Sequence, residues 1–291
     1  MLVELDPAAG FCFGVDASIA LAEKHLQQGG KLYCLGELVH NEEETLRLTD
    51  LGMVVIDYQH FSTLKNATVL LRAHGEPPST YDVASKNNLT LIDGTCPIVK
   101  SLQHKVSCSY EDISGEGGQV VVFGSKNHPE VVGLNGQTND HAIVVVTESD
   151  LESIDFTRKI HLFAQTTRSV ADYQRLQNTI KERISVKGGD PKVLLNVVQS
   201  ICKQVSNRVP QLQNFALAHE VMVFVAGKSS SNGKVLFGAA QSVNPRTFFA
   251  SDVSEIQPSW FQGVGSVGIS GATSTPKWLM ENIAGFIKQL D

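Results

Sequence analysis

Short hydrophobic runs alternate with amphipathic stretches along most of this chain. Many of the runs are nearly continuous in valine, isoleucine and leucine, which is typical of strands that are buried on both faces. We expect strands in the segments KLYCLG, MVVID, TVLLRA, LTLID, QVVVFG, AIVVVT, KIHLFA, VLLNVV, EVMVFVAG and GSVGISG. Helices are predicted between several of them, most clearly in GVDASIALAEKHLQ, SVADYQRLQNTIKERI and TPKWLMENIAGFIKQL.

This alternation of strands and helices is typical of the α/β class with parallel sheets. The strands could form one wide sheet or several small ones. Several small ones are favoured, because a cysteine follows a strand-like or glycine-marked turn at three widely separated places, Cys12, Cys96 and Cys202. The α/β units that we expect are residues 13–96, residues 97–194, and residues 1–12 together with 195–291.

The composition narrows the function without identifying it. The chain has 291 residues, of which 42% are hydrophobic and 19% are charged, so an ordered protein is expected. The net charge of -6 and the lack of a basic run argue against a surface for nucleic acid or anionic lipid. The sequence contains neither an apolar run of bilayer length nor a recognisable targeting segment. We therefore expect a cytoplasmic protein that binds neither nucleic acid nor a membrane.

Polar side chains directly follow several of the predicted strands. The segments concerned are HGEPP, SKNHPE, QTTRS, KSSSN, ATSTP and VHN. Ligands of open α/β sheets bind beyond the carboxyl ends of the strands, and a helix that starts there adds backbone N–H groups. For any single segment, helix capping is the simpler explanation. For all of them together, with histidines among them, we expect a site lined for an anion, phosphate in particular.

The five cysteines are an odd number and are widely spread, which argues against a disulfide framework. Cys34 lies within an apolar strand and Cys108 within a helical stretch, so both are predicted to be structural. Cys12, Cys96 and Cys202 can meet only if the units converge, and their thiolates would then suit zinc or an iron–sulfur cluster. Their spacing alone leaves packing open as the alternative. The sequence has neither a P-loop nor a GxGxxG motif, which argues against nucleotide binding.

A series of short motifs, ordered along the chain, resembles one known family. The motifs are GFCFGVDASI, GELVHN, LRAHGEPP, DGTCPIV, NHPEVVGLNGQ, AQTTRSV, SICKQVSNR, SSSN and GATSTP. They are similar to those of the IspH/LytB family, the 4-hydroxy-3-methylbut-2-enyl diphosphate reductases, from about residue 8 to about residue 278. The chain departs from the family pattern after the third cysteine, before the serine pair and before HPE. Lys126 and Lys228 stand at the last two places and could add positive charge near a diphosphate.

The resemblance implies a fold and an activity. The family fold is a trefoil of three similar small α/β units around a central cavity, which holds one [4Fe–4S] cluster per chain. The family reductively removes the hydroxyl group of its allylic diphosphate substrate and forms isopentenyl and dimethylallyl diphosphates, the last step of the non-mevalonate isoprenoid pathway. An iron without a protein thiolate would bind the substrate hydroxyl. The implied protein partner is a one-electron donor such as flavodoxin or ferredoxin.

The resemblance also implies roles for particular residues. The cluster ligands would be Cys12, Cys96 and Cys202. Glu130 would supply protons, and Thr166 would lie near the substrate hydroxyl, with Gln165 and Thr167 shaping the pocket. The other substrate-binding residues, on the diphosphate side, would be His40, His74, His128, Ser230, Ser231, Asn232 and Ser274.

These residue types suit the chemistry. Hydroxide is a poor leaving group, and a carboxylic acid within hydrogen-bond reach can protonate it so that water leaves. Glu130 is the expected acid, although it is also placed to complement a helix N-terminus, and Glu76 is the other acid at the strand ends. Two other classes stay open on the residues alone. One is a hydro-lyase whose cluster acts only as a Lewis acid, and the other is a non-catalytic zinc protein that senses a phosphorylated metabolite.

Overall fold

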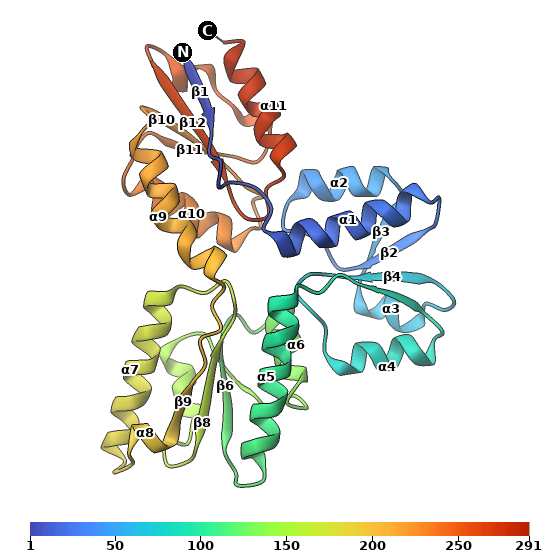
Figure 1. Ribbon diagram of the computed structural model, residues 1–291, viewed down its shortest axis with the longest axis vertical. Coiled ribbons are helices and arrows are strands. Elements are labelled where there is room, and N and C mark those ends of the chain that lie inside the picture. The colour runs from blue at the N-terminus through green and yellow to red at the C-terminus, as the bar shows by residue number, and fades with distance from the viewer. Residues whose placement is uncertain (291) are drawn as a thin grey trace. The chain divides into compact units, whose positions relative to one another are not determined.

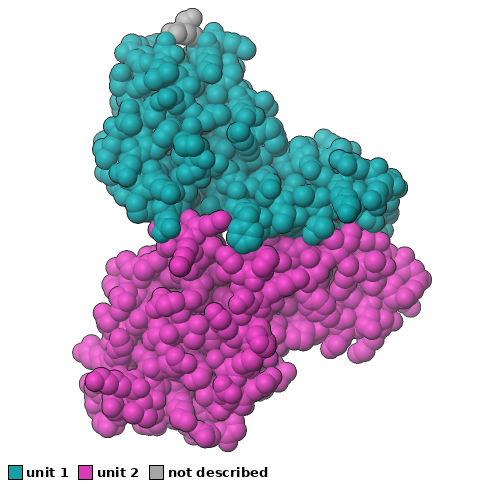
Figure 2. All heavy atoms as spheres, in the orientation of Figure 1, with its two compact units in different colours: residues 1–57, 207–291 teal, residues 58–206 magenta. Residues whose placement is uncertain are grey.

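The computed structural model describes residues 1–290 as an α/β protein (Figure 1). The chain divides into two compact units, residues 1–57 with 207–291 and residues 58–206 (Figure 2). Within the described residues the strands form three four-stranded sheets, and two of these sheets lie wholly inside one unit each. The prediction of an α/β fold with several small parallel sheets, rather than one wide sheet, is confirmed.

One sheet, in the order β1-β12-β10-β11, belongs to the first unit, and its strand pairs are parallel. Its strands are β1 (Leu2–Leu5), β10 (Val221–Val225), β11 (Thr247–Ala250) and β12 (Ser266–Gly271). Val223 and Ile269 share a core with α11 (Lys277–Lys288), whereas Met222 and Phe224 share one with α9 (Lys203–Leu217) and α10 (Ser231–Gln241). Successive side chains of a strand point to opposite faces, and both faces of this sheet are covered, which explains why the central strand β10 is apolar at every position.

The sheet of the second unit has the order β7-β6-β8-β9 and is likewise parallel. Its strands are β6 (Gln119–Phe123), β7 (Ile143–Val145), β8 (Ile160–Ala164) and β9 (Leu195–Val197). Val122 and Phe163 pack with α5 (Pro97–Ser114) and α6 (Pro129–Gly136) on one face. Phe123 and Leu162 pack with α7 (Val170–Val186) on the other face. The sheet therefore has one face covered by α5 and α6 and an opposite face covered by α7.

The third sheet contains two parallel pairs. In the first unit, β2 (Leu32–Leu35) pairs with β3 (Met53–Ile56) and is accompanied by α1 (Phe13–Gln27) and α2 (Glu42–Asp50). In the second unit, β4 (Thr68–Leu71) pairs with β5 (Thr90–Asp93). The helix α3 (Tyr58–Thr63) precedes β4 in the chain, and α4 (Pro78–Lys86) connects β4 to β5. The remaining short helices are α8 (Pro191–Leu194), η1 (Glu148–Ser153), η2 (Val253–Glu255) and η3 (Pro258–Phe261).

The hydrophobic pattern identified most of these elements. Every run that was predicted as a strand contains one, and the three helices predicted most clearly are α1, α7 and α11. The pattern missed β1 and β11, which are four residues long and lie at the two edges of their sheet. A glutamate interrupts β1, and β11 has none of the valine, isoleucine or leucine that marked the predicted strands. Within residues 1–290, no helix combines the length and the hydrophobicity that crossing a bilayer requires.

Candidate active site

Each of the three predicted cluster cysteines lies between an edge strand and the start of a helix. Cys12 follows β1 and is the N-cap of α1, Cys96 follows β5 and is the N-cap of α5, and Cys202 follows β9 and directly precedes α9. In all three turns the cysteine carbonyl accepts a hydrogen bond from the backbone N–H four residues on, at 2.9 to 3.0 Å. The three cysteines therefore occupy equivalent positions in the three sheets.

The backbone N–H groups of these cysteines repeat a second contact. They donate to the carbonyls of Thr273, Ala73 and Thr166, at 3.2, 3.0 and 2.9 Å for Cys12, Cys96 and Cys202 respectively. Each acceptor is the second residue after the strand that pairs with the cysteine's own strand. Each cysteine is thus attached to a second strand-end loop, and these loops also carry Ser274, His74 and Thr166. The side chains differ between the three loops, so the repeat is one of backbone geometry.

The three thiols fit an iron–sulfur cluster by their chemistry and their setting. A helix N-terminus favours the thiolate form of a cysteine, which is the form that binds iron. Neither Cys12 nor Cys96 makes a side-chain capping hydrogen bond to its own helix. Both cysteines are partly exposed, as is Cys202. Their meeting at one cluster stays a prediction.

The first unit gathers several of the predicted diphosphate-binding residues. Ser230 is the N-cap of α10, where its Oγ accepts a hydrogen bond from the Gly233 N–H and lies 3.4 Å from the Oγ of Ser274. The Asn232 amide donates to the Oγ1 of Thr273 at 3.0 Å. Ser231 begins α10, and its side chain lies outside what the structure describes. The loops after β10 and β12 thus bring hydroxyl and amide groups together.

His40 lies on the loop after β2, which packs closely on the loop after β10 in the same unit. A Cβ atom on Gly227 would lie 2.6 Å from the carbonyl oxygen of His40, so a side chain cannot be placed there without a shift. The Ser229 hydroxyl donates to Glu42 at 3.2 Å. Lys228, which the sequence suggested as a positive charge near the diphosphate, forms an ion pair with Glu255 at 2.6 Å. Lys126, on the other unit, is likewise paired, with Asp150 at 2.8 Å.

The second unit brings His74 and His128 together, with their ring centroids 5.3 Å apart and their planes nearly perpendicular. His128 is the N-cap of α6, and its Nδ1 accepts a hydrogen bond from the Glu130 N–H at 3.2 Å. A ring nitrogen that accepts is unprotonated, so the neutral ring carries its hydrogen on Nε2. This contact therefore sets His128 to present an N–H donor.

Two glycines allow α6 to pack directly on the HGEPP loop that carries His74. A Cβ atom on Gly136 would lie 2.3 Å from the Cβ of Pro77, and one on Gly133 would lie 3.1 Å from the carbonyl oxygen of Gly75. Gly75 itself has a φ of 74°, which favours glycine. The spacing of glycines in VVGLNGQ therefore reflects this close approach between a helix and a loop.

Glu130 is a buried carboxyl group in the first turn of α6, with 2% of the residue exposed. The Thr166 N–H donates to its Oε1 and the Thr166 hydroxyl to its Oε2, both at 2.7 Å. Burial raises the pKa of Glu130 to about 7, although the two hydrogen bonds from Thr166 lower it. Burial outweighs them because it removes the ionised form from water. A large fraction of Glu130 is therefore protonated near neutral pH, as a proton donor must be.

The other acid at the strand ends, Glu76, has a different environment. Its carboxylate is buried, lies 3.2 Å from the Arg72 guanidinium, and accepts hydrogen bonds from the hydroxyls of Tyr58 and Thr80. Burial and the charge of Glu76 raise the pKa of the Tyr58 hydroxyl. Among the described residues, by contrast, no cation pairs with Glu130. Glu76 therefore anchors its loop, and Glu130 is the acid suited to deliver a proton.

The raised pKa of Glu130 predicts a pH dependence of stability. The folded protein holds the proton up to about pH 7 and the unfolded chain only up to about pH 4.5, so stability falls as the pH rises through this window. One pKa unit corresponds to about 1.4 kcal/mol, so the free energy of unfolding should lose about 3 kcal/mol relative to Glu130→Gln. Urea denaturation of both proteins across this range measures the difference. Parallel stability curves would show that Glu130 titrates normally.

The sequence reasoning missed a buried ion pair near the Cys12 turn. The Arg208 guanidinium on α9 lies 2.6 Å from the Asp6 carboxylate and 2.7 Å from the Ser270 hydroxyl. Asp6 in turn accepts a hydrogen bond from the Ala8 N–H at the start of the loop that leads to Cys12. The available signal was weak: a single arginine in the helix after the third cysteine.

We expect Arg208→Met to destabilise the folded protein by about 3–5 kcal/mol, because it leaves the Asp6 charge buried without a partner. The measurement is urea denaturation at neutral pH. The double variant Asp6→Asn, Arg208→Met should recover part of the loss, since it removes the uncompensated charge. A double variant less stable than Arg208→Met would contradict this explanation.

Comparisons with known proteins agree with the resemblance. The family model described as LytB protein matches residues 3–288. The 4-hydroxy-3-methylbut-2-enyl diphosphate reductases of Parabacteroides distasonis and Porphyromonas gingivalis are each 48% identical to the chain. They align over 289 and 290 residues, which is 99% of this chain in both cases and 98% and 99% of the relatives.

Two solved structures share the fold. One is (E)-4-hydroxy-3-methyl-but-2-enyl diphosphate reductase, the terminal enzyme of the non-mevalonate pathway, with 34% identity and a TM-score of 0.75 over 99% of this chain and all of that one. The other is the E-1-hydroxy-2-methyl-but-2-enyl-4-diphosphate reductase of Plasmodium falciparum. Its TM-score is 0.82 at 24% identity, over 98% of this chain and 87% of that one, which supports the fold alone.

Proposed function

Because the chain belongs to the LytB protein family, we infer that it is a 4-hydroxy-3-methylbut-2-enyl diphosphate reductase. The enzyme reduces an allylic alcohol with two electrons and two protons, releases water, and forms isopentenyl or dimethylallyl diphosphate. It is an iron–sulfur oxidoreductase of the non-mevalonate isoprenoid pathway. The observation within the chain that best supports this reaction is the buried, uncompensated Glu130 bound to Thr166.

We propose that Cys12, Cys96 and Cys202 hold one [4Fe–4S] cluster per chain. Their equivalent places at the strand ends and at helix starts support this ligand set. Three thiolates leave one iron without a protein ligand. When bound, the cluster would supply single electrons and a Lewis-acidic iron for the departing hydroxyl group.

We propose that the diphosphate binds to the neutral donors predicted from the sequence. In the first unit, Ser230 and Asn232 offer hydroxyl and amide groups at the start of α10, where backbone N–H groups also favour anions, and Ser274 lies on the neighbouring loop after β12. In the second, His128 presents its Nε2–H beside the ring of His74. The proposed set is completed by His40 and Ser231. Neutral donors bind a diphosphate without burying further charge, and the anchor positions the distant hydroxyl group.

Proton delivery is proposed to run from Glu130 through Thr166. In the structure the Thr166 hydroxyl donates to Oε2 at 2.7 Å. When Oε2 carries the proton, this hydrogen bond reverses and the carboxyl group donates to the Thr166 hydroxyl. That hydroxyl then has its own hydrogen available for the substrate oxygen. The Thr166 N–H holds the other carboxyl oxygen in place at 2.7 Å. Leaving as water rather than hydroxide lowers the barrier, and an acid so placed typically contributes about 10²–10⁴-fold to the rate.

Three further expectations from the sequence stay predictions. The first is the division into α/β units at residues 13–96, at 97–194, and at 1–12 with 195–291. The second is a one-electron donor such as flavodoxin or ferredoxin, which the two-electron reduction requires. The third is a cytoplasmic location.

The decisive experiment is a turnover assay on full-length protein that has been purified without oxygen and reconstituted with iron and sulfide. Reduced viologen supplies electrons, 4-hydroxy-3-methylbut-2-enyl diphosphate is the substrate, and mass spectrometry identifies the products. Both isopentenyl and dimethylallyl diphosphates should form, and only with the reductant present. Product formation without reductant would indicate a hydro-lyase instead. A protein that carries the full cluster and forms no product would contradict the proposed reaction.

A further inference from the structure

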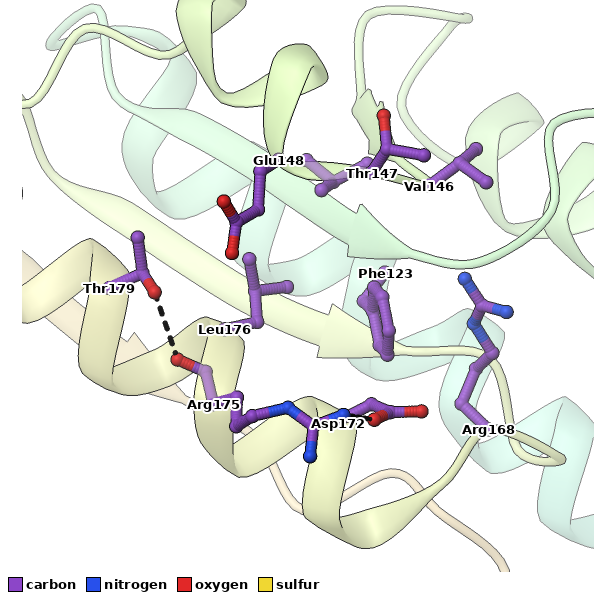
Figure 3. A pocket seen from close by; sticks show the side chains of 10 residues that line it. Phe123, Val146, Thr147, Glu148, Arg168, Asp172, Arg175, Leu176 and Thr179 are labelled. Carbon is purple, nitrogen blue, oxygen red and sulfur yellow. Dashed lines mark hydrogen bonds and ion pairs between the residues drawn. The ribbon is translucent and has the colours of Figure 1, made fainter.

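A pocket of about 300 Å³ lies under the N-terminal half of α7, within the second unit (Figure 3). Phe123 and Leu176 line it from the sheet and the helix, and residues 145–148 line it from the end of β7. Phe123 belongs to the face of the sheet that α7 covers, whereas Glu130 lies on α6, which covers the opposite face. The pocket is therefore separate from the residues assigned to the reductase site.

Arg168 is the cationic group of the pocket that no carboxylate neutralises directly. Its guanidinium lies over the Phe123 ring, 4.2 Å from the centroid. Its Nε is buried and has no hydrogen-bond partner among the residues that the structure describes. Burial lowers the pKa of Arg168, which indicates that the guanidinium has lost water. An unsatisfied donor on a partly desolvated arginine costs free energy, and a hydrogen-bond acceptor from outside the chain would remove that cost.

The other charged groups restrict what that acceptor can be. Arg175 and Asp172, both on α7, form an ion pair with each other. The Asp172 charge raises the pKa of Arg168, but burial outweighs this effect, and no carboxylate of the described residues forms an ion pair with Arg168. Figure 3 shows Glu148 projecting over Leu176, away from the end of the pocket where Arg168 and Phe123 lie. Asp172 and Glu148 would repel a ligand of high negative charge. A single negative charge beside Arg168, with an apolar body over Phe123 and Leu176, is compatible with all of these groups.

We propose that this pocket is a second binding site, for a small monocarboxylate with an apolar body, and that Arg168 binds the carboxylate. The planar guanidinium matches a carboxylate with two parallel hydrogen bonds. The volume lies at the lower end of the range for small-molecule sites, which suits a compact ligand. Phe123 and Leu176 are 7% and 8% exposed, so the apolar body covers only the little of this wall that water still reaches, and the carboxylate contact contributes more to binding.

The position of Arg168 gives the site a route to the reductase residues. Its backbone N–H donates to the Gln165 carbonyl at 3.0 Å, which closes a turn that contains Thr166. Thr166 holds Glu130 from the same turn. A ligand on Arg168 would therefore act on the turn that positions the proton donor. This regulatory consequence rests on the proposed function, whereas binding itself does not.

Benzoate is a suitable probe, because it joins one carboxylate to a compact apolar ring. Isothermal titration of the full-length, cluster-loaded protein should give a dissociation constant on the order of 1 mM, as expected for a ligand of this size. Benzamide, the neutral isostere, and phenyl phosphate, which carries more charge, should both bind more weakly. Arg168→Gln should weaken benzoate binding by at least about tenfold.

Two controls separate the pocket from other anion sites. Arg183→Gln removes an arginine of α7 that, like Arg168, lies over an aromatic ring, that of Phe156, and it should leave benzoate binding unchanged. Ser274→Ala, at the proposed diphosphate site, should also leave it unchanged. Benzoate binding that is absent in the wild type, equal to that of benzamide, or indifferent to Arg168→Gln would overturn the proposal. None of these outcomes depends on whether the reductase reaction is correct.

Discussion

Replacing Glu130 by glutamine should lower kcat by about 10²–10⁴-fold and change KM little. Glutamine keeps the shape of the side chain and can still accept a hydrogen bond from the Thr166 N–H, so the turn should persist. It has no acidic proton to deliver, so the hydroxyl would have to leave as hydroxide. The substrate should bind nearly as before, because the proposed diphosphate anchors are other side chains. Steady-state kinetics with reduced viologen measures both constants.

The matched control for this variant is Glu182→Gln, which changes an exposed glutamate on α7 of the same unit. Its kcat should equal that of the wild type. The cluster content of Glu130→Gln should also equal that of the wild type, because Glu130 is not a proposed ligand. If Glu130→Gln keeps full activity with a full cluster, another group supplies the proton and the assignment of Glu130 is wrong.

Replacing Cys96 by serine should abolish the cluster and the activity together. Loss of an outer-shell partner alone typically costs about 10–100-fold in metal affinity, and loss of a thiolate ligand should cost more. Serine is a favourable residue at a helix N-cap, and Cys96 occupies that position in α5. The helix should therefore start as before, and the fold should be retained. After reconstitution, iron and sulfide analysis with the visible spectrum measures the cluster, turnover with reduced viologen measures the activity, and circular dichroism measures the fold.

Cys108→Ser is the control, because Cys108 lies on the same helix and has no proposed ligand role. It should keep both cluster and turnover. Cys12→Ser and Cys202→Ser should reproduce the loss seen with Cys96→Ser, since the three cysteines are proposed to act as one set. A Cys96→Ser protein that retains a four-iron cluster would remove Cys96 from the ligands and leave the proposed site incomplete.

Much of the fold could be predicted from the sequence because its strands are covered on both faces. In QVVVFG, residues 120–123 are all apolar because they pack alternately against α5 and α7, and such a run is visible without any alignment. β1 and β11 were missed because Glu4 interrupts the first run, and the second, TFFA, contains no valine, isoleucine or leucine. The sheet order could not be read from the sequence either, because pairing depends on contacts between distant segments.

The candidate residues were identified by motif and by their place after strands. Their burial, partners and protonation could not be predicted from the sequence. The sequence contains two acids at strand ends, Glu76 and Glu130, and only the family resemblance favours Glu130 as the proton donor. Packing gives them different environments. Glu76 forms an ion pair with Arg72 and accepts a hydrogen bond from Tyr58, whereas Glu130 is buried without a cation and can hold a proton near neutral pH. The ion pair of Asp6 with Arg208 was missed because its partners are far apart in the sequence.

The sequence by itself determined the α/β class, the strand-end position of the candidate residues and the family resemblance, since these follow from local patterns along the chain. Only the tertiary structure decided which polar groups are buried, which form hydrogen bonds or ion pairs, and which are left without a partner. The repeated backbone contact of the three cysteines and the unsatisfied guanidinium of Arg168 both belong to that second kind. The physical reason is that hydrogen-bond partners, desolvation and charge compensation depend on distances between residues that the order of amino acids does not specify.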